Sequence, residues 1–249
     1  MLRDTPDRQE IIDPHGLLEA VMTTWVEVGL QVPDGELHWM VRSEIPSGVG
    51  LKSSSAVAAA AVLALADATG TELETAQVVE VAVRAQFAAG CTVTGSVDDT
   101  WAALTLGWKV VNPSVPVAEG VALEGIWPNP EDWAVFIVER GERTAEIDPQ
   151  AFGMAQPNFQ KALMAIQQGA LDNAMTENGR GVASATRDTA GRKICNDLLV
   201  WGARCASISG SGPSIAFLIP TVNEAAIDRI LETIEQRGLT VFETAIRTE

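Results

Sequence analysis

Ile45-Pro-Ser-Gly-Val-Gly-Leu-Lys-Ser-Ser-Ser-Ala56 is the most informative stretch of this chain. Pro46, Gly48 and Gly50 predict a tight loop, and the serines after it stand where a helix begins, ahead of the apolar run 56–66. A glycine-rich loop that enters a helix presents unpaired backbone N–H groups and the positive end of the helix dipole, and such a structure binds phosphate. The serines either cap the helix or lend a hydroxyl to a metal ion. The stretch therefore predicts an enzyme that handles a nucleotide.

Two commoner phosphate-binding motifs do not fit this stretch. A P-loop needs Gly directly before Lys-Ser/Thr, whereas Leu51 precedes Lys52 here. The dinucleotide fingerprint G-x-G-x-x-G needs a glycine where Ser53 stands, and its acidic partner downstream is not evident. The alternatives that remain are a phosphate loop of another kind and a serine-rich cap on a buried, alanine-rich helix.

Length and composition limit the class of protein. The 249 residues, 47% of them hydrophobic, are enough for one sizeable core or two small ones. No apolar run reaches the ~18 residues of a membrane span, and the charged start of the chain is no signal peptide. Cys91, Cys195 and Cys205 form no C-x-x-C pair, which favours reduced thiols. We therefore expect a cytoplasmic protein without a membrane partner.

The charge balance narrows the partners further. The chain has 33 acidic and 17 basic residues, which argues against nucleic acid because phosphate backbones demand clusters of Lys and Arg. His15 and His38 are the only histidines, so a histidine-based zinc site or a Ser-His-Asp triad has little support. An acidic protein that binds ATP must concentrate its few cations near the phosphates or rely on Mg²⁺.

Hydrophobic periodicity predicts an α+β chain in two packed halves. The helix after the loop is apolar almost all round, so we expect it to be central and buried. The polar stretch 140–157 is the plausible boundary between the halves. Helices are expected over 14–28, 54–68, 73–88, 100–106, 158–168, 171–187, 192–201 and 223–236, and strands over 37–41, 133–138, both ends of 205–218, and 239–244.

Two further segments carry chemistry. Ser209-Gly-Ser-Gly-Pro-Ser214 lies between two apolar strands, where glycines let the backbone approach another loop or a ligand, although a tight β-hairpin has the same composition. Thr92-Val-Thr-Gly-Ser-Val-Asp98-Asp99 leads into an apolar helix. Two carboxylates at a helix start often only cap it, but a kinase needs a carboxylate that orients the attacking hydroxyl and accepts its proton.

Together these segments resemble the motifs of the GHMP kinases, the family of galactokinase, homoserine kinase and mevalonate kinase. The first stretch fits the second family motif, roughly P-x-x-x-G-L-G/x-S-S-A, and Ser209 to Ser214 resembles the third. The triple serine and the Thr-Gly-x-x-Asp-Asp box are similar to archaeal-type shikimate kinases, in an order and spacing that hold from about Asp13 to the C-terminus.

The resemblance implies a two-lobed α+β fold. Its N-terminal ATP-binding half (1–145) would be like ribosomal protein S5 domain 2, and its C-terminal half (146–249) a ferredoxin-like α/β domain. The implied cofactors are ATP and Mg²⁺, and the implied reaction is transfer of the γ-phosphoryl group to the 3-hydroxyl of shikimate. A mevalonate or homoserine type of kinase and an inactive, nucleotide-binding remnant are the alternatives.

The resemblance also assigns site residues one by one. Asp98 is expected to orient and deprotonate the acceptor hydroxyl, with Asp99 as its polar neighbour, and Ser54 to ligate Mg²⁺. Thr94, Gly95 and Asp98 are expected to bind the substrate. Lys52 replaces the family's usual glycine and either reaches a phosphate or is solvated. The residues expected to bind ATP are Pro46, Gly48, Gly50, Leu51, Lys52, Ser53, Ser54, Ser55, Gly210, Ser211 and Gly212.

The sequence departs from the family pattern at two places. Family members open with strands and a first motif, whereas this sequence begins at what resembles the linker before the first helix. We expect a start codon assigned too late, with a true remnant as the alternative. The second departure is Gln86, preceded by Glu80, in the region where relatives place a metal-binding carboxylate about a dozen residues before the catalytic Asp.

Overall fold

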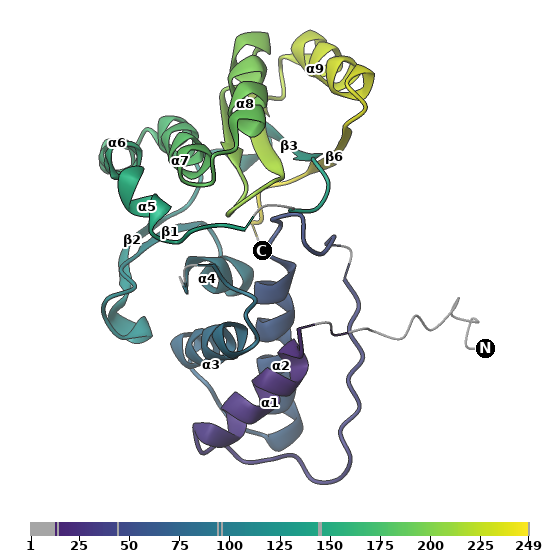
Figure 1. The fold of residues 1–249 in the computed structure, drawn as a ribbon, viewed down its shortest axis with the longest axis vertical. Coiled ribbons are helices and arrows are strands. Elements are labelled where there is room, and N and C mark those ends of the chain that lie inside the picture. Colours follow the sequence, from purple (N-terminus) through teal and green to yellow (C-terminus); the bar gives the residue numbers. More distant parts are fainter. Residues whose placement is uncertain are drawn as a thin grey trace, which may run out of the picture.

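The chain forms a helical lobe and an α/β lobe that meet in the middle of the molecule (Figure 1). This computed structural model describes residues 13, 15–43, 45–93, 95, 97–143 and 146–248. The helical lobe contains α1 (Leu17–Glu27), α2 (Ser53–Thr69), α3 (Thr75–Ala88) and α4 (Asp98–Leu104). The other lobe contains the larger sheet and its helices, so the expected α+β chain in two packed halves is confirmed.

The helical lobe is built around the contacts of α3 with α1 and α2. Its core includes Val21 and Trp25 of α1 and Val62 and Leu65 of α2, all essentially inaccessible to solvent. The chain enters α1 through Asp13, whose carboxylate oxygens accept hydrogen bonds from the N–H groups of Leu17 and Leu18. This packing fixes the end of α2 that begins at the glycine-rich loop.

A small hairpin that was not predicted from the sequence follows α4. β1 (Trp108–Val111) and β2 (Val121–Gly125) pair antiparallel, and a 3-10 turn, η1 (Val117–Glu119), lies between them. Trp101 and Val97 form a small apolar cluster with Val79 of α3, and hairpin residues pack against that cluster. The hairpin therefore secures α4, which carries the two aspartates.

The second lobe is a four-stranded antiparallel sheet in the order β4-β5-β3-β6, with helices over it. Phe136 of β3 stacks on Phe217 of β5 with ring centroids 5.1 Å apart, and Leu198, Ile230 and Ile234 complete the core between the sheet and its helices. The strands are β3 (Trp133–Glu139), β4 (Cys205–Ile208), β5 (Ile215–Pro220) and β6 (Thr240–Thr244), a further 3-10 turn is η2 (Pro130–Asp132), and the helices are α5 (Ala151–Met154), α6 (Gln156–Gln167), α7 (Leu171–Ala185), α8 (Thr189–Trp201) and α9 (Glu224–Gln236).

Two expectations about the helical lobe are wrong. The segment 37–41 is extended but belongs to no strand, because no segment of the described chain pairs with it. Its side chains still alternate between packed and exposed positions, since Trp39 and Val41 pack against the lobe's core while Met40 is 78% exposed. The helix α2 is not buried all round either: its face with Ala60 and Leu63 is exposed, because only one side packs against α1, α3 and α4.

The strand β3 (Trp133–Glu139) belongs to the sheet of the second lobe. β3 precedes the predicted boundary between residues 145 and 146, yet it pairs with β5 and β6 in the middle of the second lobe's sheet. The limits 1–145 and 146–249 stay a prediction. Across the described residues, we find no helix with the length and apolar character needed to cross a membrane.

Candidate active site

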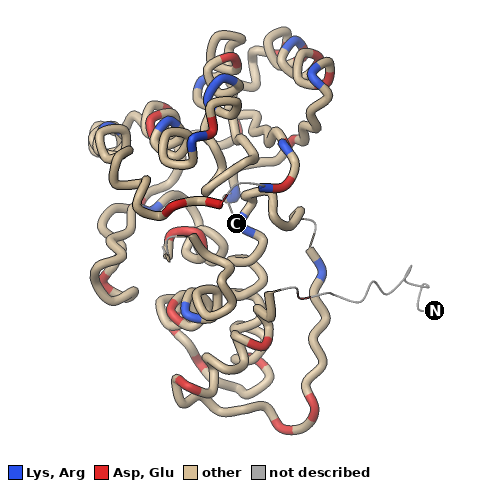
Figure 2. Tube along the Cα trace, in the orientation of Figure 1, with Lys and Arg blue, Asp and Glu red and all other residues tan. Residues whose placement is uncertain are grey.

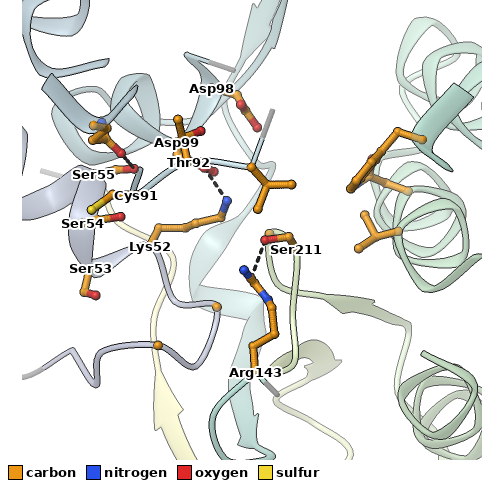
Figure 3. A pocket seen from close by; sticks show the side chains of 18 of the residues that line it. Lys52, Ser53, Ser54, Ser55, Cys91, Thr92, Asp98, Asp99, Arg143 and Ser211 are labelled. Atoms are coloured by element: carbon orange, nitrogen blue, oxygen red, sulfur yellow. Dashed lines mark hydrogen bonds and ion pairs between the residues drawn. The ribbon is translucent and has the colours of Figure 1, made fainter. Parts of the chain in front are cut away.

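A cleft of about 410 Å³ lies where the two lobes meet. The glycine-rich loop, the start of α2 and the start of α4 form one side, and the loop after β4 and the helices of the second lobe form the other (Figure 3). Figure 2 shows that Lys and Arg are sparse in the helical lobe and more frequent in the second lobe and at the junction. The cleft is lined by two of these cations, Lys52 and Arg143.

The glycine-rich loop leads directly into α2. Gly48 and Gly50 have positive φ angles of 76° and 85°, which glycine adopts without a steric penalty. Lys52 takes the N-cap position with φ 63° and makes no side-chain cap, so the alternative in which serines cap the helix is wrong. Ser53, Ser54 and Ser55 occupy the first turn instead. Backbone N–H groups there have no intrahelical acceptor, and all three serines line the cleft.

The loop between β4 and β5 closes on the glycine-rich loop. Ser209 Oγ donates to the carbonyl oxygen of Gly50 (3.0 Å), and the N–H of Ser214 donates to the carbonyl oxygen of Val49 (3.0 Å). A Cβ atom on Gly50 would overlap the carbonyl group of Gly212. The prediction that these glycines permit a close approach between two loops is therefore confirmed.

Arg143, which follows β3, holds both loops. Arg143 donates from its backbone N–H to the carbonyl oxygen of Gly48 (3.2 Å) and from Nη2 to Ser211 Oγ (2.5 Å) and to the carbonyl oxygen of Gly212 (2.8 Å). Partial burial lowers the pKa of the Arg143 guanidinium, which leaves it a cation at neutral pH. Nothing local in the sequence distinguishes Arg143 from other arginines, so its place in the site was not predicted.

Arg140 holds the loop between β4 and β5. Its guanidinium donates to both carboxylate oxygens of Asp188 (2.5 and 2.9 Å) and to the carbonyl oxygen of Pro213 (3.0 Å). Asp188 in turn accepts a 2.8 Å hydrogen bond from the N–H of Gly191 and caps α8. Burial alone would raise the pKa of Asp188, but the hydrogen bonds from Arg140 and Gly191 outweigh it and lower the pKa.

The two aspartates at the start of α4 differ in environment. The Lys52 ammonium donates to Oδ2 of Asp99, so Lys52 is not simply solvated. The Asp98 side chain lines the cleft in an exposed position, whereas that of Asp99 is 24% exposed. Burial and the neighbouring charge of Asp98 raise the pKa of Asp99, against the opposing effect of Lys52. Figure 3 shows the ammonium pointing at Asp99, with Asp98 beyond it.

The third serine and Gln86 form a buried network. Ser55 Oγ donates to Gln86 Oε1 (2.8 Å), and Gln86 Nε2 donates to Thr100 Oγ1 (3.1 Å) and to the carbonyl oxygen of Ala82 (3.2 Å). Ser55, Gln86 and Thr100 are all buried. The network ties α2, α3 and α4 together, so the side chain of Ser55 has a structural partner.

Other residues expected in the site lie in the turn before α4 and in the two loops. Gly95 donates from its N–H to Thr92 Oγ1 (3.0 Å) in the turn before α4, and Thr94 lies outside the described residues. Gly210 and Ser211 line the cleft, while Gly212 contacts Gly50 and Arg143. Pro46 and Leu51 belong to the glycine-rich loop but do not line the cleft.

The opposite wall of the cleft was not predicted. Phe152 and Phe159 stack with ring centroids 6.3 Å apart, and both line the cleft together with Asn178 and Val182 of α7. Gly181 of α7 makes room for Phe159, because a Cβ atom there would lie 2.6 Å from its ring. This wall is mainly apolar, in contrast to the polar side formed by the glycine-rich loop and α4.

The residues present fit a magnesium ion only when it arrives with nucleotide phosphates. No cluster of three or more His, Cys, Asp or Glu side chains in the described part of the chain could hold a metal. The Ser54 hydroxyl and the Asp98 carboxylate both line the cleft. Mg²⁺ takes few protein oxygens when substrate phosphates and water supply the others, so this donor set is sufficient for Mg²⁺ bound to ATP.

Known proteins resemble this chain in sequence and in fold. Residues 17–107 match the family of the GHMP kinases N terminal domain. A shikimate kinase of Methanothrix thermoacetophila is 32% identical over 242 residues, which span 94% of this chain and 78% of that protein. A shikimate kinase of Methanococcoides burtonii is 29% identical, with 80% and 67% of the two chains covered. The crystal structure of the Methanococcus jannaschii mevalonate kinase has a TM-score of 0.65 at 13% identity and covers 96% of this chain and 77% of that chain.

The chain belongs to the GHMP kinase family. Within that family it groups with the archaeal shikimate kinases, and the predicted two-lobed GHMP fold is confirmed. Membership makes the protein a kinase of small molecules that takes its phosphoryl group from ATP.

Proposed function

We propose that this protein transfers the γ-phosphoryl group of ATP to the 3-hydroxyl of shikimate, in the biosynthesis of chorismate and aromatic amino acids. One observation carries the proposal: the first turn of α2 and the Asp98 carboxylate line the same cleft between the lobes. The archaeal relatives named shikimate kinase, at about 30% identity over most of the chain, support the choice of acceptor. We further propose that the enzyme acts in the cytoplasm without nucleic acid or membrane partners.

The phosphates of ATP lie in this proposal against the backbone N–H groups of residues 48–55. The positive end of α2 attracts the negative charge, and the loop 209–214 backs the phosphate site. Ser54 would hold the Mg²⁺ that accompanies ATP, and the ion would neutralise charge on the phosphate oxygens. Ser209 and Ser214 hold the glycine-rich loop in place from the second lobe.

The transfer itself needs a proton acceptor. The acceptor oxygen forms a bond to the γ-phosphorus while the bond from that phosphorus to the β–γ bridging oxygen breaks, and ADP leaves with the electron pair. The proton of the acceptor hydroxyl passes to the Asp98 carboxylate, which also orients the hydroxyl. Asp98 suits this role better than Asp99, because Asp99 already accepts a hydrogen bond from Lys52.

The second wall of the cleft suits a small ring that carries hydroxyls and a carboxylate. Phe152, Phe159 and Val182 offer apolar surface to the ring, and Asn178 offers hydrogen bonds to hydroxyls. The Arg143 guanidinium lines the same cleft and is suited to a carboxylate. We propose Gly95 and Thr94 as further contacts of the acceptor.

A coupled assay of ADP release tests the assignment. The 249-residue protein is given Mg²⁺-ATP and, separately, shikimate, mevalonate, homoserine or galactose, with the Asp98→Asn variant as the control for background hydrolysis. We expect turnover with shikimate well above that with the other alcohols. Turnover with mevalonate and none with shikimate would refute the acceptor and leave the kinase fold unaffected.

A further inference from the structure

Lys52 has an unusual backbone conformation for its residue type. Its φ angle is 63°, in the left-handed region where a side chain meets a steric penalty that glycine avoids. Only Asn129 and Arg187 share a positive φ among the described non-glycine residues. Such strain persists only where surrounding contacts enforce it, and it is concentrated at functional sites.

The surrounding contacts come from two other segments. A Cβ atom on Gly210 would overlap the Cε of Lys52, so the glycine of the β4–β5 loop leaves the space through which the lysine side chain runs. The ammonium then reaches the Asp99 carboxylate on α4. The side chains of Lys52 and Asp99 are 32% and 24% exposed, so the pair is partly shielded from water and faces the cleft.

Lys52 lies between the part of the cleft proposed for the phosphates and the part proposed for the acceptor hydroxyl. Lys52 is the N-cap of α2, directly before the serines of the first turn, and its ammonium ends beside α4, which carries Asp98 (Figure 3). The other cation that lines the cleft, Arg143, is directed at Ser211 and the carbonyl oxygen of Gly212 on the far loop. Gln86, behind the serines, is neutral and contributes no charge.

We propose that Lys52 is a catalytic residue whose ammonium contacts the γ-phosphoryl oxygens during transfer, and that Asp99 is the positioning residue that holds it. The inference rests on the proposed kinase function. The Lys52 ammonium stabilises negative charge on the phosphoryl group as the bond to the bridging oxygen breaks, and the proton of the acceptor still goes to Asp98. The adjacent aspartates thus have separate tasks.

The Lys52→Gly variant tests the catalytic role without damaging the fold. Glycine removes the ammonium and also relieves the backbone strain, so we expect an unchanged or higher melting temperature. Turnover with shikimate should fall by about 10²-fold or more, as when one preorganised donor is removed from a developing charge. Lys52→Met, which keeps the length and the strained backbone, should lose as much turnover without the gain in melting temperature.

Arg187→Gly is the matched control. Arg187 has φ 56°, is exposed between α7 and α8 and does not line the cleft. Its replacement relieves similar strain and should leave turnover unchanged.

A double mutant tests the positioning role of Asp99. Asp99→Asn should lower kcat by a smaller factor than Lys52→Gly and leave the KM for shikimate unchanged, because the lysine remains but is less well held. The double variant Lys52→Gly/Asp99→Asn should turn over as slowly as Lys52→Gly alone, since Asp99 acts through Lys52.

The outcomes separate this inference from the proposed function. A wild-type protein without kinase activity would overturn both. An active wild type with Lys52→Gly turnover within about threefold of it, far short of the loss expected for a charge-stabilising donor, would overturn the role of Lys52 alone. Losses that multiply in the double variant would overturn the positioning role of Asp99.

Discussion

Ser209 Oγ donates a 3.0 Å hydrogen bond to the carbonyl oxygen of Gly50, joining the loop that enters α2 to the loop between β4 and β5. The bond spans 159 positions of sequence and connects the helical lobe to the α/β lobe. The glycine-rich loop therefore depends for its shape on a segment of the other lobe. Substitutions at this contact should affect both stability and nucleotide binding.

Gly50→Ala tests that dependence. The new methyl group would overlap the carbonyl group of Gly212, and alanine at φ 85° is strained, so we expect a loss of at least about 2 kcal/mol in the free energy of unfolding and weaker ATP binding. Gly169→Ala is the matched control, because Gly169 has φ 74° with no atom within 4 Å of its added Cβ. The Gly169→Ala variant should lose only the free energy that alanine costs at a positive φ angle, about 1 kcal/mol. Equal losses in urea unfolding would show that the loops are not in close contact.

Substitutions of two serines of α2 should separate effects on ATP binding from effects on thermal stability. Ser54→Ala removes a hydroxyl that lines the cleft, so we expect weaker binding of Mg²⁺-ATP with nearly unchanged thermal stability. Ser55→Ala leaves Gln86 Oε1 without its buried donor and should cost about 1–3 kcal/mol of stability. Thermal shifts with and without Mg²⁺-ATP measure both effects. If ATP stabilises Ser54→Ala as much as the wild type, Ser54 has no role in holding the nucleotide.

Asp98→Asn should test the proposed catalytic role of this carboxylate. Asp98 is the first residue of α4 and not its N-cap, which is Val97 and makes no side-chain cap. Asn keeps the size but cannot accept the proton at neutral pH, so kcat should fall by about 10²–10⁴-fold with little change in melting temperature. The Asp99→Asn variant should show a smaller fall in kcat. Steady-state kinetics with shikimate, alongside melting curves, give the comparison. Near wild-type turnover in both variants would mean that the reaction proceeds by positioning and electrostatics without a carboxylate base.

The pair of Arg140 and Asp188 should make stability depend on pH. The pKa of Asp188 is lowered in the folded protein, so its contribution is present above the pKa of the unfolded state, ~4, and is lost as pH falls through the folded value. Asp188→Asn should therefore be less stable than the wild type at pH 7, by about 1–3 kcal/mol. The difference should shrink as the pH falls below ~4. A difference that stays constant from neutral to acid pH in urea unfolding would contradict this linkage.

Much of the fold was predictable because it depends on local pattern. Apolar periodicity located most of the helices, and the unbroken run 133–138 predicted β3. The hairpin of β1 and β2 was missed, because Trp108-Lys-Val-Val111 is short and shows no alternation. The strand predicted over 37–41 was wrong for the opposite reason. Its side chains do alternate, but a strand also needs a neighbouring strand, which a local pattern cannot supply.

The candidate site was predictable only where a motif lies within one segment. The glycine-rich loop, the β4–β5 loop and the two aspartates were found in this way, and all three segments meet at the cleft. Arg143 and the wall formed by Phe152 and Phe159 have no local signal, since they reach the cleft through the packing of the second lobe. The ion pair of Lys52 and Asp99 joins residues 47 positions apart, so its partners could not be matched from sequence.

The strand order β4-β5-β3-β6 has a consequence for synthesis of the chain on the ribosome. β3 emerges before α5, α6, α7 and α8, and both strands that pair with it are made later still. During that interval the side chains of Phe136 and Val138 lack their final cover, and both edges of β3 are open to other chains. Between the translation of β3 and that of β5, the nascent protein therefore exposes an unpaired strand that favours aggregation.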